Sequence, residues 1–141
     1  MSATGLRVFD STIQTTNIWL DELMREMAWD DRHKAYHALR AVLHTLRDRL
    51  PVNEAMQLAA QLPMLVRGFY FEGWNPQNKP VKERSQDVFL SHVGDAFLFD
   101  VEADARKITR AVLGVLSRHV TSGEIEDVKG ILPHDIRELW P

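Results

Sequence analysis

The chain has 141 residues, a net charge of -3 at pH 7 and no cysteine. This length suits one domain with its own core, and the lack of cysteine excludes disulfides, thiolate metal sites and thiol nucleophiles. Interspersed charges of both signs argue against a nucleic-acid binder driven by phosphate contacts. With no signal pattern at 1–10 and no apolar run of about 18 residues, we expect a soluble, cytoplasmic protein outside the membrane.

Helical periodicity begins near the N-terminus. The first helix is predicted to begin after Asp10 and Ser11, which are good N-cap residues, and to end near Trp29. Its apolar positions recur at helical spacing at Ile13, Leu20, Leu23, Met24 and Met27.

A second helix is predicted over 32–49, with one apolar stripe formed by Leu39, Leu43, Leu46 and Leu50. Pro51 ends it, and a third helix follows whose buried face is predicted to be Ala55, Leu58, Ala59 and Leu62. Pro63 ends that helix or begins a short fourth one. Turn-forming residues then dominate 73–80, which predicts a linker.

The second half follows the same plan. Ser85 is predicted to cap a helix bearing Phe89, Leu90, Val93 and Phe97, and 104–119 to form a long helix with Thr109, Leu113, Leu116 and Val120 on one stripe. Thr121 and Glu124 are typical of a capping box, in which the glutamate reaches back to the first amide. Pro133 opens a last turn. No strand alternation occurs, so the predicted class is all-α.

Residues 40–70 and 110–140 align without a gap at an offset of 70. The identical pairs are Arg40/Arg110, Ala41/Ala111, Val42/Val112, Leu43/Leu113, Leu46/Leu116, Glu54/Glu124, Leu62/Leu132, Pro63/Pro133 and Arg67/Arg137. Unrelated helices of similar composition would share only about two identities over this length. The alignment therefore indicates an internal duplication.

We predict a single domain over 1–141, with repeat one over about 11–71, a linker over about 72–84 and repeat two over about 85–141. Each repeat has three to four helices and is too small to bury its apolar stripes alone. Two repeats packed with pseudo-twofold symmetry would bury both sets. The identical residues are then most simply explained as structural residues that both repeats need. The Arg and Glu residues that are identical in the two repeats could instead form a duplicated functional constellation.

One departure from the repeat is a stripe of His and Arg side chains on the second helix. His33, His37, Arg40, His44 and Arg47 fall along one helical face. The simplest interpretation is a solvated polar face. A ligand- or anion-binding face is the alternative, and a metal site is a third, less supported one, because spacing supplies no third ligand for the His33/His37 pair.

The other departure is an apolar segment at 64–74. It is either extra core between the halves or a surface for a partner, with Phe69, Phe71 and Trp74 as apolar anchors and Arg67 and Glu72 at the rim. We favour outward-facing Phe71 and Trp74, because they lie where the helix ends and the linker begins.

Three stretches, at 39–44, 61–74 and 123–128 with Leu132-Pro133, resemble the bacterial family known as domain of unknown function 2267. The resemblance spans nearly the whole chain and implies an all-helical, cytoplasmic bacterial protein. It carries no activity, cofactor or catalytic residue.

No catalytic signature is present: a Gly-x-Ser-x-Gly elbow and a glycine-rich phosphate loop are both missing. We therefore predict a non-enzymatic interaction or scaffold module without a cofactor, binding a protein partner or a second copy. The sequence leaves open whether the protein is an enzyme. The alternative is a small-molecule or metal-binding protein that uses the face of His33, His37 and His44.

Overall fold

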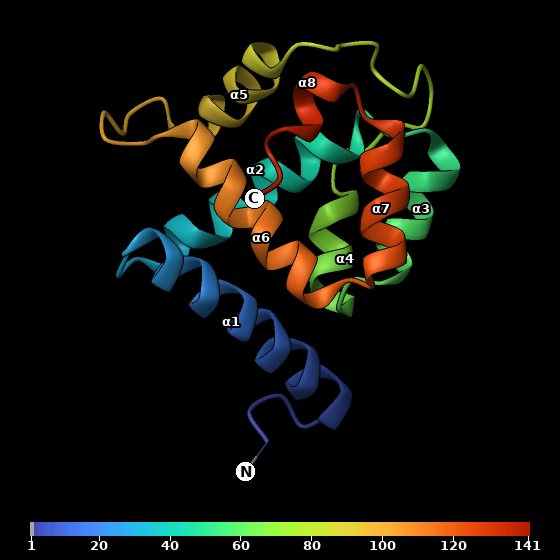
Figure 1. Ribbon diagram of the computed structural model, residues 1–141. Helices are drawn as coiled ribbons and strands as arrows, with labels where there is room; N and C mark the ends of the chain where they lie inside the picture. The colour runs from blue at the N-terminus through green and yellow to red at the C-terminus, as the bar shows by residue number, and fades with distance from the viewer. Residues whose placement is uncertain (1) are drawn as a thin grey trace.

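The computed structural model describes residues 2–141, and these residues form helices and no strands (Figure 1). The elements are α1 (Arg7–Met27), α2 (Arg32–Arg47), α3 (Val52–Ala60), α4 (Met64–Phe71), α5 (Gln86–Gly94), the short 3-10 helix η1 (Asp95–Phe97), α6 (Ala105–His119), α7 (Ser122–Ile131) and α8 (His134–Arg137). The predicted all-α class is confirmed.

Helix α1 begins at Arg7, earlier than predicted, because Asp10 does not cap it. The Asp10 carboxylate instead accepts hydrogen bonds from the backbone amide of Thr4, at 3.0 Å, and from its hydroxyl, at 2.8 Å. These bonds hold the turn that precedes the helix, and α1 gains an extra turn at its N-terminus. Its N-terminal half projects from the rest of the molecule (Figure 1).

Helix α2 is the centre of the fold and packs against α1, α4, α5 and α6. Asp31 caps its N-terminus by accepting a hydrogen bond from the Lys34 amide at 3.2 Å. The predicted leucine stripe is buried in full at Leu39, Leu43, Leu46 and Leu50. In α6, the corresponding stripe of Thr109, Leu113, Leu116 and Val120 is also buried.

Proline residues separate the two short helices in each half of the chain. Pro63 precedes α4 and Pro133 precedes α8, with φ and ψ of -55° and 151° at Pro63 and -56° and 147° at Pro133. Because these extended conformations interrupt the helical path, the chain turns before each short helix.

The predicted N-caps of α5 and α7 are confirmed, but one contact of the α7 capping box is not. Ser85 caps α5 by accepting a hydrogen bond from the Val88 amide at 3.3 Å, and Thr121 caps α7 by accepting one from the Glu124 amide at 3.4 Å. The reciprocal half of the predicted capping box is wrong. The Thr121 amide donates to Oε1 of Gln61 at 2.9 Å instead, so the Glu124 side chain is available to another contact.

In the part of the chain that the structure describes, no helix combines the length and the apolar character needed to cross a membrane.

Candidate functional site

Three members of the predicted His/Arg face bind the C-terminal end of α4. His44 Nε2 lies 2.6 Å from the carbonyl oxygen of Phe69, and Nη1 of Arg47 donates to the carbonyls of Tyr70 and, at 2.7 Å, Glu72. Arg40 forms an ion pair with the Glu72 carboxylate at 3.4 Å. The last carbonyls of a helix lack intrahelical partners and carry partial negative charge, so these cationic and polar side chains stabilise the helix end.

His33 and His37 occupy the exposed end of the same stripe. Their Nε2 atoms lie 2.9 Å apart, which requires one ring to donate and the other to accept. Within residues 2–141, the one group of three His, Asp or Glu side chains close enough together to hold a metal ion lies elsewhere in the molecule. The five predicted residues are therefore divided: three bind the end of α4, and two face solvent.

The predicted interaction surface is also divided by the fold. Phe69 is buried, and Phe71 and Trp74 are half-buried against the core, so the expected outward projection of Phe71 and Trp74 is wrong. The two rings pack against each other with centroids 5.3 Å apart, because the backbone turns directly after α4, where the Trp74 amide donates to the Phe71 carbonyl at 3.0 Å. Arg67 donates to the carbonyls of Ala59 and Leu62 at the end of α3, both at 2.9 Å.

An apolar groove of about 980 Å³ lies between α1, α2 and α4. Its apolar walls include Phe9, Ile13 and Leu20 from α1 and Met64 and Leu65 from α4. The polar residues at its border include members of both predicted sets, His33 and Glu72. The groove thus joins the two surfaces that the sequence analysis treated separately.

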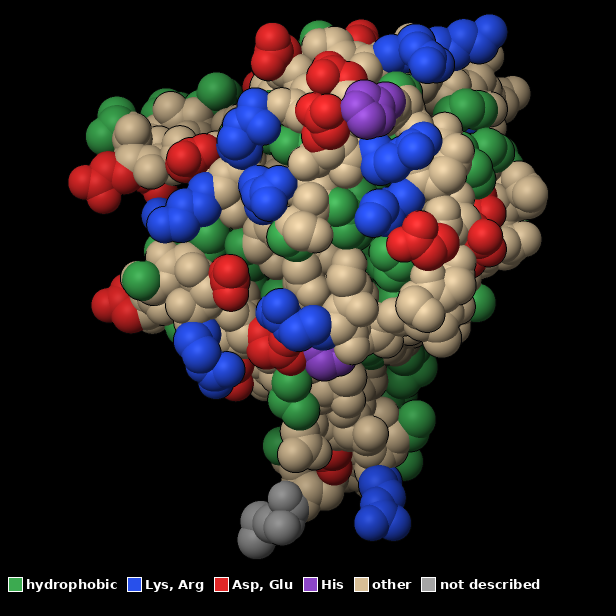
Figure 2. All heavy atoms as spheres, viewed as in Figure 1, with side chains coloured by type: hydrophobic (Ala, Val, Ile, Leu, Met, Phe, Trp, Pro, Cys, Tyr) green, Lys and Arg blue, Asp and Glu red, His purple; other side chains and the backbone are tan. Residues whose placement is uncertain are grey.

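The α1 wall of the groove belongs to a longer apolar seam. Residues on this seam recur at alternating steps of three and four, the spacing of a coiled-coil heptad, at Phe9, Ile13, Thr16, Leu20, Leu23 and Met27, and the spacing extends in the sequence to Leu6, the N-cap residue just before the helix. From Thr16 onward the seam is buried, whereas Leu6, Phe9 and Ile13 are exposed. The projecting end of α1 accordingly carries hydrophobic side chains on its flanks (Figure 2).

A second exposed apolar feature is the loop between η1 and α6. Leu98, Phe99 and Val101 extend into solvent there. Asp100 in the same loop pairs with Lys34 at 2.6 Å, which attaches the loop to the start of α2.

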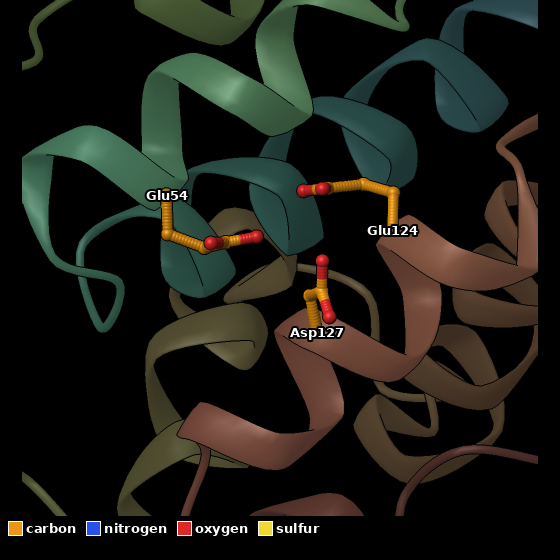
Figure 3. A group of neighbouring side chains, drawn as sticks. All are labelled: Glu54, Glu124 and Asp127. Carbon is orange, nitrogen blue, oxygen red and sulfur yellow. The ribbon is translucent and has the colours of Figure 1, made fainter.

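Three carboxyl groups converge where α3 packs against α7. Glu54 comes from the first turn of α3, and Glu124 and Asp127 come from one face of α7 (Figure 3). One carboxylate oxygen from each lies within 4.8 Å of the others. Sequence reasoning singled out Glu54 and Glu124 as an identical pair but did not place them together, and it missed Asp127.

The two glutamates of this carboxylate cluster are buried, with exposed fractions of 5 % for Glu54 and 6 % for Glu124, while Asp127 is exposed. Burial, together with the neighbouring Glu54 carboxyl, raises the pKa of Glu124 to about 7. Both effects disfavour the charged form of a carboxyl group. The cluster therefore favours a bound positive charge or a proton.

The fold and its surface define an all-α protein whose longest helix leaves half of an apolar seam unpaired beside a groove. Residues 16–139 match the family described as an uncharacterized conserved protein, DUF2267, and the chain belongs to this family. The resemblance seen in the sequence is thereby confirmed. No curated protein matches the chain.

Proposed function

We propose that this protein is a non-enzymatic interaction module that self-associates through the exposed half of the α1 seam. The proposal is based on a change in solvent exposure along the seam. The seam residues from Thr16 onward are buried, whereas Ile13 and the seam residues before it are exposed. A heptad seam is suited to packing against another helix. Its buried half meets α2 and α6 within the chain, and its exposed half has an open groove beside it.

A second copy of the chain is the occupant that we infer. Each copy offers both an apolar helix and the groove beside it, which is the self-complementary arrangement that a twofold dimer needs. An antiparallel pair of α1 helices centred near Phe9 sets Leu6 of one copy against Ile13 of the other. It also brings Arg7 within reach of the oppositely charged Asp10, and Met64 and Leu65 extend the apolar contact on α4.

Ile13 and Ile18 provide a matched pair of variants to test this dimer. Both are isoleucines on α1 with similar exposed fractions, 40 % and 46 %, but only Ile13 lines the groove. We expect the wild type to sediment as a dimer, and Ile13→Ser to weaken dimerisation by at least ~10-fold. Each dimer loses two isoleucines whose exposed surface, 40 % of each residue, would be buried at the interface, and each contributes on the order of 1 kcal/mol.

Ile18→Ser and Phe99→Ser should leave the dimer unchanged. A wild type that stays monomeric at several hundred micromolar would contradict the proposal, as would an equal effect of Ile13→Ser and Ile18→Ser. Disruption by Phe99→Ser alone would assign the contact to the loop before α6 instead. The groove would be a small-molecule site if the wild type were a monomer whose melting temperature rises when a small apolar ligand is added. In that case Ile13→Ser should show no such rise.

We also propose that the domain consists of two related halves, about 11–71 and 85–141, joined by 72–84. Equivalent hydrogen bonds support this: Nη2 of Arg67 donates to the Leu62 carbonyl at 2.9 Å, and Nη2 of Arg137 donates to the Leu132 carbonyl at 3.1 Å. The matching backbone angles of Pro63 and Pro133 support it further. So does the side-by-side placement of α3 and α7, which carry the identical Glu54 and Glu124.

A further inference from the structure

The carboxylate cluster of Glu54, Glu124 and Asp127 contains buried oxygens without a hydrogen-bond donor. Oε1 of Glu54 and Oε2 of Glu124 are inaccessible to solvent and unpartnered, in side chains that are both more than nine-tenths buried. Among residues 2–141, none of the ion pairs formed by Lys, Arg or His involves these three carboxylates. A buried carboxylate is costly unless it is protonated, paired or bound to a metal.

The direction of the side chains points to a ligand between them. All three carboxyl groups are aimed at a common point between α3 and α7 (Figure 3). A proton shared by Glu54 and Glu124 would neutralise the buried pair, but it would leave the third carboxylate without a role. Asp127, three residues from Glu124 on one face of α7, adds an exposed carboxylate at the same point, so the arrangement offers three oxygen ligands to a cation.

We propose that Glu54, Glu124 and Asp127 bind one hard divalent cation, for which Ca²⁺ is the best fit. The donor set consists of carboxylate oxygens alone, which suits Ca²⁺, Mg²⁺ or Mn²⁺ rather than Zn²⁺ or Cu²⁺. The three ligand atoms lie within 4.8 Å of one another, close enough to share one ion. Ca²⁺ accepts several carboxylate oxygens in a flexible geometry, whereas Mg²⁺ demands a near-ideal octahedron and is usually held by one or two carboxylates.

The cation would connect the two halves of the molecule. Glu54 approaches from α3, and Glu124 and Asp127 approach from positions three residues apart on one face of α7. Because Asp127 is exposed, the ion can enter on its side and keep water as its remaining ligands. A ligand that binds only the folded chain raises its stability, so binding can be measured without knowledge of any activity.

The test uses the full chain, stripped of metal by a chelator, and titrates it with CaCl₂, MgCl₂ or MnCl₂ in calorimetry and thermal unfolding. We expect Ca²⁺ to bind one ion per chain and to raise the melting temperature. Asp127→Asn, which changes only the exposed ligand, should weaken Ca²⁺ binding at least tenfold while the protein stays folded. Glu54→Gln should abolish binding.

Glu126→Gln is the matched control, because Glu126 is an exposed acid on α7 outside the cluster. It should bind Ca²⁺ as the wild type does. The proposal is overturned if none of the three cations binds at about 10 mM, well above the ~10⁻⁴–10⁻³ M range of weak protein calcium sites. It is also overturned if Asp127→Asn and Glu126→Gln lower the affinity equally, which would indicate diffuse charge attraction. A parallel titration with ZnCl₂ in which Zn²⁺ binds and none of Ca²⁺, Mg²⁺ and Mn²⁺ does would likewise contradict it.

Discussion

At the scale of single residues, the polar groups of α2 act mainly on a neighbouring helix. Arg47 is buried and donates hydrogen bonds to two carbonyls near the end of α4, and His44 contacts a third. Burial lowers the pKa of His44, and the nearby charges of Arg47 and Arg40 lower it further, against the opposing effects of the Phe69 carbonyl and Asp48. The folded state therefore favours neutral His44.

This pKa shift predicts a pH dependence of stability. The unfolded chain binds a proton at His44 near pH 6.5 and the folded chain only at lower pH, so protonation favours unfolding as the pH falls through 6.5. His44→Gln retains a donor for the Phe69 carbonyl but does not titrate. In urea unfolding between about pH 7.5 and pH 5, the wild type should lose more stability than His44→Gln. Parallel curves for the two proteins would show that His44 does not titrate differently in the folded state.

At the scale of helices, α6 carries a glycine in its interior at a position where its counterpart α2 has His44. Gly114 has a helical backbone, and an added Cβ would lie 3.5 Å from Cγ of Pro141 and 3.6 Å from Nη1 of Arg118. These distances are ordinary van der Waals contacts. The glycine therefore lowers helix stability without relieving a clash.

Gly114→Ala should accordingly stabilise the protein by roughly 0.5–1 kcal/mol, measured from the urea midpoint. Gly73→Ala is the informative contrast. Gly73 has φ of 73°, a left-handed conformation that disfavours alanine, so the same substitution there should be destabilising. A loss of stability in Gly114→Ala would mean that the contact with Pro141 is tighter than the structure indicates.

At the scale of the whole molecule, α2 and α6 bury leucines that lie 70 residues apart in the sequence, in one continuous core. Leu43 in α2 and Leu113 in α6 have exposed fractions of 0 % and 1 %. Because α2 and α6 pack against each other and share α1 and α5 as neighbours, neither half of the chain buries its stripe by itself. The two positions should therefore contribute comparably to global stability.

Leu43→Ala and Leu113→Ala should each destabilise the fold by about 2–5 kcal/mol, the usual cost of truncating a buried leucine. The measurement is chemical unfolding followed by far-UV circular dichroism, with Ile131→Ala as an exposed aliphatic control that should change stability by no more than about 0.5 kcal/mol. If either leucine substitution were neutral, the core would not be shared between the halves as the structure indicates.

Local patterns in the amino-acid sequence were sufficient to predict most helices, the buried leucine stripes and the family. Apolar spacing, prolines and N-cap residues act over one or two turns, so they can be read without knowing what each helix contacts. The partners of the polar groups depend on how the helices pack, which these local patterns do not contain. Helix packing turned His44 and Arg47 toward α4, Phe71 and Trp74 toward the core, and Glu124 toward Glu54 rather than the Thr121 amide. The groove also depends on helix packing, because it lies where α1 extends beyond the helices that cover its C-terminal half. A heptad seam in the sequence predicts that α1 packs against another helix, but it does not predict how much of α1 that helix covers.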